Sequence, residues 1–187
     1  MKIKFIAQSG FIIETKQGLI TIDLWLDNPL HKLELKDVPK TDYVFITHDH
    51  ADHDLPTGIE LAKRDKSHFI SNYDIMKHAQ EQGVENIAPG NIGGLYPVGD
   101  IEIAQTHAEH SSNIGLPVGF IIKVEGKTLY HMGDTGYFKG LDTLAEFYNI
   151  DILFVPIGSR YTMGPKEASL AVADIKPKIV IPMHYNT

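Results

Sequence analysis

The feature that most constrains this chain is the apolar run at residues 42–47 (DYVFIT), which ends at a cluster of histidines. Its β-branched and aromatic residues are continuous, which is typical of a buried strand. Earlier short runs, separated by glycine-containing turns, predict an antiparallel meander. Two helices should follow, the second beginning at an Asn72 N-cap and ending at Gly83. The predicted strands are residues 2–7, 10–15, 19–26 and 42–47, and the first predicted helix is residues 57–66.

The second half of the chain repeats this order of elements. Pro165 suits the first residue of a helix, because the N–H that it lacks has no partner there. Strands followed by helices, twice over, predict an α/β (α+β) fold of two βα halves packed sheet to sheet with helices outside. No linker or low-complexity segment interrupts residues 1–187, so we expect a single domain. The predicted strands are residues 100–106, 118–124, 127–132, 151–155 and 178–183, and the predicted helices are residues 141–148 and 165–174.

Composition narrows the chemistry that the chain can perform. The 187 residues include no cysteine and ten histidines, so a metal ion must be held by imidazoles and carboxylates. The formal net charge of −7 argues against a nucleic-acid binder, which needs a basic face. No apolar run reaches the roughly 20 residues of a membrane span, and the first residues lack the regions of a signal peptide. We therefore expect a cytoplasmic protein without a membrane segment.

The histidine cluster after the buried strand is THDHADH at residues 47–53, with the pattern H-x-H-x-D-H. Spacings of two, two and one cannot line one face of a helix, but on a tight loop at a strand end they can converge. His48 and His50 then supply nitrogens to one cation, and Asp52 and His53 supply an oxygen and a nitrogen to a second. Such donors suit Zn²⁺, Mn²⁺ or Fe²⁺. The alternative is a polar surface loop, which the preceding buried strand disfavours.

One loop cannot complete two metal sites, so further ligands must come from distant segments. The candidates, each at or near a predicted strand end, are His110, Asp134 between two glycines, and His184. His107 competes with His110 for the same role, but on an alternating strand the two point to opposite faces. The remaining histidines without a partner at ligand spacing are interpreted as ordinary surface or core residues: His31, His68 and His78.

These motifs resemble the metallo-β-lactamase superfamily, and more narrowly the uncharacterised metal-dependent hydrolases of bacteria and archaea akin to the ascorbate-phosphate lactonases. They lie in family order along nearly the whole chain. The resemblance implies a four-layer αβ/βα metallo-β-lactamase sandwich. The segments that carry it are THDHADH at 47–53, EHSS at 109–112, YHMGDT at 130–135, PIG and YTMGP within 156–165, and PMHYNT at 182–187.

The resemblance also implies a role for each candidate ligand. Asp23, at the end of an early strand, matches a structural aspartate that orients the histidine-rich loop. The implied ligands are His48, His50 and His110 for the first metal ion, Asp52, His53 and His184 for the second, and Asp134 as a bridge between both.

Three features depart from the pattern of that family. The family often has a histidine where Gln8 stands and an aspartate where Ser159 stands. Both positions lie near the site in relatives, so they bear on substrate specificity. Relatives also continue well past the last ligand, so we expect a C-terminal helix and strand beyond Thr187.

The predicted function is metal-dependent hydrolysis of a small-molecule ester, lactone or phosphodiester. Two divalent cations, Zn²⁺ first and Mn²⁺ as the alternative, can share a water and lower its pKa toward about 7. The resulting hydroxide would attack the substrate. Asp52, which can orient that hydroxide, and the bridging Asp134 are the expected catalytic residues.

Two other functions stay open. A nuclease of the same fold is disfavoured by the net charge and by the lack of an appended RNA-binding domain. A non-hydrolytic metal-binding or di-iron redox protein is disfavoured because such relatives usually carry a carboxylate where His50 stands. The expected partner is a small anionic substrate, with Arg160 and Lys166 as candidate contacts. Nucleic acid is not expected as a partner, and a homo-oligomer stays open.

Overall fold

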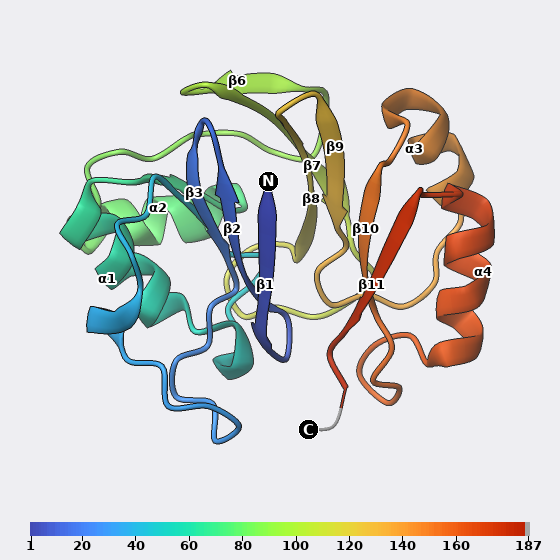
Figure 1. Ribbon diagram of the computed structural model, residues 1–187, viewed down its shortest axis with the longest axis horizontal. Helices are drawn as coiled ribbons and strands as arrows, with labels where there is room; N and C mark the ends of the chain where they lie inside the picture. Colours follow the sequence, from blue (N-terminus) through green and yellow to red (C-terminus); the bar gives the residue numbers. More distant parts are fainter. Residues whose placement is uncertain (186–187) are drawn as a thin grey trace. The chain divides into compact units, whose positions relative to one another are not determined.

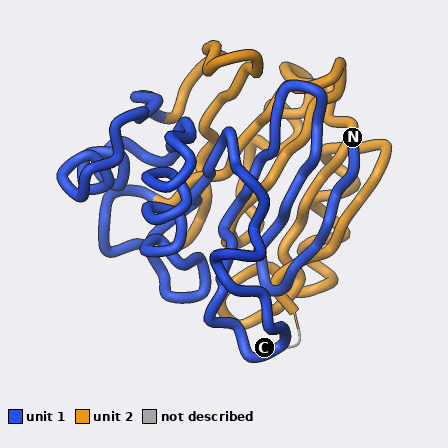
Figure 2. Tube along the Cα trace, turned by 60° about the vertical axis from the view of Figure 1, so that its left-hand side comes forward, with its two compact units in different colours: residues 1–91, 112–116 blue, residues 92–111, 117–187 orange. Residues whose placement is uncertain are grey.

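The computed structural model describes residues 1–185, which fall into two compact units. Unit 1 comprises Met1–Asn91 with Ser112–Leu116, and unit 2 comprises Ile92–Ser111 with the chain from Pro117 onward (Figure 2). Among the described residues, each unit carries one β-sheet and two α-helices. The predicted mixed α/β fold with two sheets is confirmed. The end of the PMHYNT motif, Asn186 and Thr187, lies outside the described residues.

The sheet of unit 1 has the strand order β1-β2-β3-β4-β5, of which β1, β2 and β3 are labelled in Figure 1. β1, β2 and β3 form the predicted antiparallel meander, whereas β3, β4 and β5 run parallel. Segments that follow β3 and β4 therefore begin at the same edge of the sheet. The elements are β1 (Lys2–Ala7), β2 (Gly10–Thr15), β3 (Gly18–Ile22), β4 (Tyr43–Phe45), β5 (His68–Ile70), α1 (Leu55–Asp65) and α2 (Tyr73–Glu81), with 3₁₀ turns at Leu35–Asp37 and Ala51–His53.

The two helices of unit 1 begin at side-chain caps. The Asp54 carboxylate caps α1 by accepting hydrogen bonds from the Thr57 N–H at 3.2 Å and hydroxyl at 2.7 Å. The predicted cap of α2, Asn72, accepts a hydrogen bond from the Ile75 N–H at 2.9 Å. Such caps satisfy N–H groups that have no partner within the helix. The apolar faces of both helices pack on the sheet in one core that includes the fully buried Leu61, Phe69 and Met76.

The sheet of unit 2 has the strand order β11-β10-β9-β8-β7-β6 (Figure 1). Strands β6 to β9 are antiparallel, whereas β9, β10 and β11 run parallel. Residues from α3, α4 and the sheet share a buried core that includes Leu141, Leu153 and Ala171. The elements are β6 (Tyr96–Val98), β7 (Ile101–His107), β8 (Val118–Val124), β9 (Lys127–His131), β10 (Ile152–Pro156), β11 (Ile179–Met183), α3 (Leu141–Tyr148) and α4 (Pro165–Ile175).

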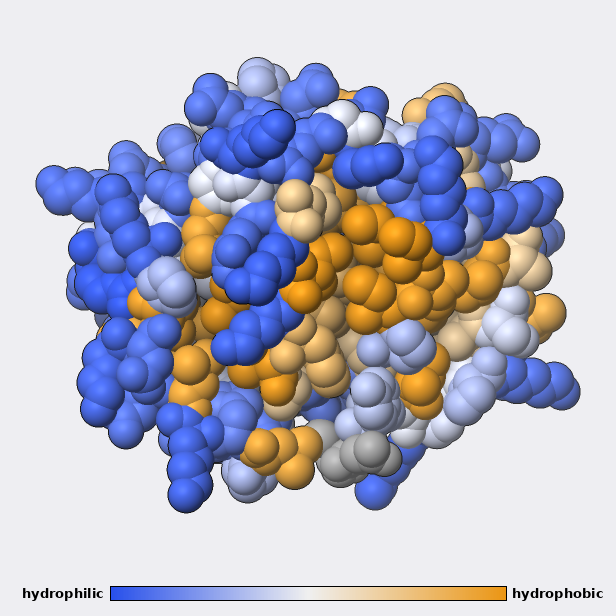
Figure 3. Space-filling view, in the orientation of Figure 1, coloured by the Kyte–Doolittle hydropathy of each residue, from blue (hydrophilic) through white to orange (hydrophobic). Residues whose placement is uncertain are grey.

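Apolar side chains are exposed at one edge of this second sheet. β11 is the last strand of the described order, and its Ile179 and Val180 are 53% and 38% exposed. Figure 3 shows apolar surface over the region of β10 and β11. An edge strand presents backbone groups that can pair with further chain. None of the described helices is long and apolar enough to cross a membrane.

Several boundaries differ from the predictions. The strand predicted at residues 19–26 is wrong beyond Ile22, because Asp23 adopts left-handed backbone with a φ of 44° that ends the extended run. The strand predicted at 42–47 is shorter, Tyr43–Phe45. The helix predicted to begin at residue 57 begins at Leu55, because its cap is Asp54. β5 and β6 were not predicted, since three-residue strands are too short to give a periodic pattern.

Candidate metal centre

In unit 1, four ligand-type side chains follow β4 within six consecutive residues. The chain leaves the sheet at Phe45, and the residues that carry the motif fold into a loop closed by the 3₁₀ turn Ala51–His53. His48 and His53 are fully buried, whereas Asp52 keeps 28% of its side chain exposed. A turn of this tightness lets residues two and one apart converge, as the motif predicted. The ligand-type residues of the loop are His48, His50, Asp52 and His53.

Asp23 anchors this loop from the end of β3. Its carboxylate accepts hydrogen bonds from the Thr47 N–H at 2.8 Å and the Thr47 hydroxyl at 2.7 Å. The same carboxylate lies 2.8 Å from Nδ1 of His53. Because a carboxylate only accepts, the His53 proton belongs on Nδ1, and its Nε2 then carries a lone pair. A carboxylate behind a histidine is the usual way to fix the tautomer and orientation of a metal ligand.

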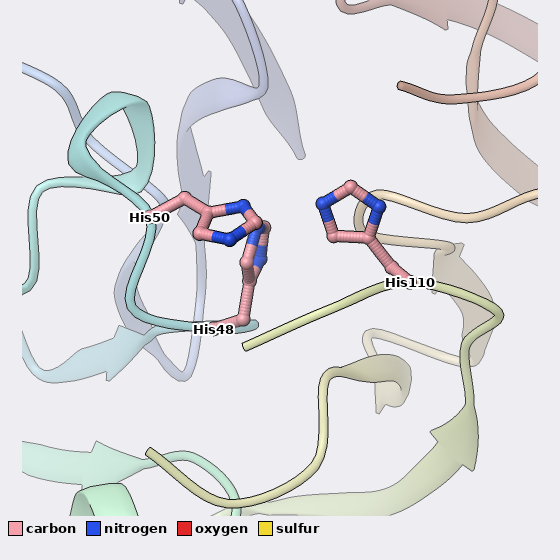
Figure 4. Close-up of side chains that lie close together, drawn as sticks. All are labelled: His48, His50 and His110. Atoms are coloured by element: carbon pink, nitrogen blue, oxygen red, sulfur yellow. The ribbon is translucent and has the colours of Figure 1, made fainter. Parts of the chain in front are cut away.

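His48 and His50 present two ring nitrogens to each other at hydrogen-bond distance, which is close to the spacing of two ligands on one cation. Nε2 of His48 lies 2.9 Å from Nδ1 of His50, and the two rings lie beside one another (Figure 4). Two nitrogens bound to tetrahedral zinc lie about 3.3 Å apart. The Thr47 hydroxyl, which donates to Asp23, lies 3.1 Å from Nδ1 of His48 and can accept its proton. Nε2 of His48 is then the nitrogen available to a metal.

Asp52 is held from the turn between β1 and β2. The Gln8 carboxamide donates from Nε2 to Oδ2 of Asp52 at 2.8 Å. The other oxygen, Oδ1, lies 3.9 Å from Nε2 of His53. The two neighbouring ligand-type residues therefore face each other through Oδ1 and Nε2.

In unit 2, the ligand-type side chains come from three different strand ends. Asp134 follows β9 and His184 follows β11, and both strands run parallel in the same sheet. Their carboxyl ends therefore meet at one edge of that sheet. Oδ2 of Asp134 lies 2.9 Å from Nε2 of His184 and 3.7 Å from Nε2 of His110. All three side chains are at least nine-tenths buried.

Backbone contacts bring the segment of His110 to that of Asp134. The Glu109 N–H donates to the Thr135 hydroxyl at 2.9 Å, and the Gly136 N–H donates to the Glu109 carbonyl at 2.9 Å. Two hydrogen bonds therefore join the neighbour of His110 to the two residues that follow Asp134. This arrangement places the carboxylate of Asp134 between the imidazoles of His110 and His184.

His184 depends on a glycine in the loop after β10. A Cβ added at Gly158 would come within 2.9 Å of Nδ1 of His184 and closer still to its carbonyl oxygen. His184 itself adopts left-handed backbone, with a φ of 55°. Left-handed backbone is uncommon outside glycine and marks strain at functional sites. The PIG segment thus supports the last ligand by leaving room for it.

The other histidines are held in contacts of their own. His107 is 51% exposed and lies 3.1 Å from Glu109, so it points away from the buried His110. The ring of His131 is buried against Phe154. His31 lies 3.0 Å from the Trp25 carbonyl.

Asp49 is one of the unassigned positions of the H-x-H-x-D-H pattern. It connects the histidine-rich loop to Ser112 and Asn113, which lie far along the chain but belong to unit 1. Its carboxylate accepts hydrogen bonds from the Ser112 hydroxyl at 2.8 Å and the Asn113 N–H at 2.7 Å. Burial opposes the charged form of Asp49, but these hydrogen bonds outweigh burial and lower its pKa. The contacts of Asp49 with residues 112–113, and of Gln8 with Asp52, were not predicted, because each joins segments that are far apart in the sequence.

Comparison with known proteins places this geometry in a family. A model described as the beta-lactamase superfamily domain matches residues 2–184. A UPF0173 metal-dependent hydrolase from Pyrobaculum islandicum is 42% identical over 192 aligned positions, which cover 100% of this chain and 85% of the relative. The chain belongs to the UPF0173 metal-dependent hydrolases of the metallo-β-lactamase superfamily. A second member, from Staphylothermus marinus, is 44% identical, and the aligned region covers 99% of this chain and 83% of that relative.

A solved structure of similar sequence shares the fold. Igni18, a metallo hydrolase from Ignicoccus hospitalis, superposes with a TM-score of 0.91 at 38% identity, covering 98% of this chain and 82% of that chain. The predicted superfamily, its fold and the hydrolase class are confirmed. As a UPF0173 member, the protein is a metal-dependent hydrolase, and its His and Asp side chains are of the type that can bind metal. Continuation past Thr187 stays a prediction.

Proposed function

We propose that this hydrolase uses two divalent metal ions to cleave a small-molecule ester, lactone or phosphodiester. The observation that carries the proposal is the spacing of donor atoms within each unit. The 2.9 Å between the His48 and His50 nitrogens, and the 2.9 Å between Asp134 and His184, suit ligands of a shared cation. The ligands we propose are those that the family resemblance implies: His48, His50 and His110 for one ion, Asp52, His53 and His184 for the other, and Asp134 for both.

The donor set favours zinc over harder cations. It contains five imidazoles and two carboxylates among seven ligands, and nitrogen-rich sets suit Zn²⁺, whereas Mn²⁺ prefers more oxygen. Seven ligands also exceed what one tetrahedral ion needs. We therefore propose two Zn²⁺ ions, with Mn²⁺ as the alternative.

When bound, the two cations supply Lewis acidity, which activates a water and polarises the bond to be cleaved. The residues of the chain provide the remaining functions. Asp52, the most exposed of the ligand-type carboxylates, can accept a hydrogen bond from the attacking water and orient it. The Asp134 carboxylate lies between two histidines, where its negative charge would offset the positive charge of the bound cations. Asp23 keeps the His53 proton on Nδ1.

The substrate we propose is a small anion rather than a polymer. The net charge of −7 argues against a nucleic acid, which needs a long basic face on the protein. Two cations, Arg160 and Lys166, flank the YTMG segment, and Arg160 stacks over Tyr161 at 5.0 Å. Two cations at this segment suit a single phosphate or carboxylate better than a polyanion. The likeness of the motifs to lactonases of phosphorylated sugars makes a phosphorylated lactone the first substrate to test.

A substrate screen tests the proposal. Zinc-loaded protein is assayed against lactones, aryl esters, phosphodiesters and a single-stranded RNA, with Asp134→Asn as the control for contaminating enzymes. We expect turnover of at least one small substrate, and loss of that turnover in the control. The proposal would be wrong if the protein cleaved RNA faster than it turned over every small substrate and if the control lost this cleavage. The protein would then be assigned as a nuclease.

A further inference from the structure

The turn between β1 and β2 is buried, which is unusual for a turn of two residues. Gln8 and Ser9 lie between the strands, yet they are only 4% and 0% exposed. Connecting turns normally lie at the surface, because their backbone needs polar partners. Gly10, directly after the turn, lies so close to Asp23 that an added Cβ would meet the Asp23 carbonyl at 3.0 Å. The turn is therefore packed against the residue that anchors the ligand loop.

Gln8 occupies this turn in a strained conformation. Its φ is 54°, in the left-handed region that glycine and asparagine tolerate better than glutamine. Strain of about 1 kcal/mol or more persists only where surrounding contacts impose it, and it concentrates at functional sites. A glutamine kept at such a position is a reason to ask what its side chain does.

The side chain of Gln8 makes a directional contact with Asp52. A carboxylate has no hydrogen to give, so the carboxamide must present its NH₂ group, and Nε2 donates to Oδ2 at 2.8 Å. The other oxygen of Asp52, Oδ1, lies 3.9 Å from Nε2 of His53. That nitrogen is the one available to a metal, because Asp23 holds the proton on Nδ1 of His53. The two oxygens of Asp52 thus have different surroundings.

We infer that Gln8 is a positioning residue: its carboxamide holds Oδ2 of Asp52 and so presents Oδ1 to the metal ion shared with His53. This inference rests on the proposed two-metal site and adds to it the residue that orients one ligand. Gln8 supplies a neutral donor, so it fixes the carboxylate without neutralising the charge that attracts the cation. A carboxylate oxygen that is directed at a hydrogen-bond donor leaves the other oxygen to face the cation.

Two substitutions separate the donor from the rest of the side chain. Gln8→Met keeps the length and volume and removes the donor. Gln8→Asn keeps the carboxamide but shortens its reach. Because asparagine tolerates left-handed backbone, this variant tests the role of the contact with Asp52 even if the Met variant does not fold. The matched control is Gln105→Met, which removes another buried glutamine, one that lies in β7 of unit 2.

The readout is metal binding. Chelator competition measures the affinity for each metal ion. The visible absorption of the Co²⁺-substituted protein reports changes in the arrangement of the ligands, and thermal unfolding shows whether each variant is folded. We expect both Gln8 variants to bind the second metal about 10- to 100-fold more weakly, the range seen when partners behind a ligand are lost. The first metal should bind as in the wild type. The Co²⁺ spectrum should change in both Gln8 variants and stay unchanged in Gln105→Met.

Two results would contradict the inference and are distinguishable. If the folded Gln8 variants keep wild-type affinity for both metals and an unchanged Co²⁺ spectrum, Gln8 does not position Asp52, and the proposed function stands. If the wild type itself binds no more than one metal, the two-metal site is overturned and the role of Gln8 falls with it. The first result is seen only in the variants, and the second is seen before any substitution is made.

Discussion

The ligand-type residues of unit 1 and unit 2 reach their positions in different ways. In unit 1, four of them lie within six residues of one loop, and Asp23 holds that loop through Thr47 and His53. In unit 2, three come from the ends of separate strands, and parallel pairing places two of them at one sheet edge. The ligand-type residues of unit 1 are neighbours in the sequence, and their loop is held by one carboxylate, that of Asp23. Those of unit 2 depend on the whole sheet and on the space left by a glycine.

The largest expected effect comes from removing a ligand in either unit. We expect His50→Ala in unit 1 and Asp134→Asn in unit 2 each to lower kcat/KM by more than about 100-fold, beyond the loss of a partner behind a ligand. Steady-state kinetics on the substrate found in the screen measures this. His78→Ala is the control and should be near neutral. His31 is a poorer control, because it contacts the Trp25 carbonyl. Equal losses in His50→Ala and His78→Ala would disprove the ligand assignment.

The difference between the two units explains how far the sequence could predict the site. The H-x-H-x-D-H spacing is visible because the loop is contiguous, and a buried strand before it marks the strand end. Asp134 and His184 could be proposed only from neighbouring glycines and a preceding apolar run, and their pairing needs the parallel register of β9, β10 and β11. Gln8 was noted as a departure from the family, but its contact with Asp52 spans 44 positions, and no local pattern encodes it.

The fold was predictable to a similar degree. Runs such as β8 and α3 match their predicted bounds, because their periodicity or continuous apolar character fills the whole element. The end of β3 could not be predicted, since the left-handed backbone of Asp23 follows from its contacts with Thr47 and His53. Long-range contacts override the local apolar pattern there.

The anchor of unit 1 should affect metal binding strongly. Asp23→Asn keeps the shape of the side chain but weakens the acceptor for His53 and Thr47, so the ligand tautomer is no longer fixed. We expect metal affinity to fall about 10- to 100-fold. Chelator competition measures it. Unchanged affinity in a folded variant would mean that the loop is held by other contacts.

The glycine that makes room in unit 2 should have a smaller effect. In Gly158→Ala, the new methyl group would collide with the carbonyl oxygen and the ring of His184, so the backbone that carries this ligand must shift. We expect a loss of metal affinity of about tenfold, the lower end of the range for altered support of a ligand. Gly94→Ala is the matched control, since an added Cβ there meets nothing within 4 Å. Wild-type affinity in Gly158→Ala would show that the ring tolerates the displacement.

The smallest effect on metal binding is expected at Asp151, a buried carboxylate of unit 2 that pairs with the largely exposed Lys178 and is not a proposed ligand. Its carboxylate accepts hydrogen bonds from Lys178 at 2.7 Å and from the Thr128 N–H at 2.8 Å, and the bond from Lys178 is the main cause of its lowered pKa. A pKa that is lower in the folded state stabilises the fold above the unfolded pKa near 3.8, and the gain is lost as pH falls through the folded pKa.

Asp151→Asn should therefore lower the free energy of unfolding by about 1–2 kcal/mol at pH 7, with both metals retained. The difference from the wild type should shrink as pH falls below about 4. Denaturant titrations at pH 7 and pH 3 measure this. A loss of metal in this variant would mean that the losses expected from Gly158→Ala report the stability of unit 2 rather than the position of His184.

Metal content tests the central claim most directly. The protein is stripped with a chelator, reconstituted with Zn²⁺, freed of excess metal and measured by elemental analysis against protein concentration. The local ligands of unit 1 and the fold-assembled ligands of unit 2 together predict close to two zinc ions per chain, falling toward one or fewer in Asp134→Asn. A wild-type protein that never exceeds one metal ion per chain would contradict the two-metal site.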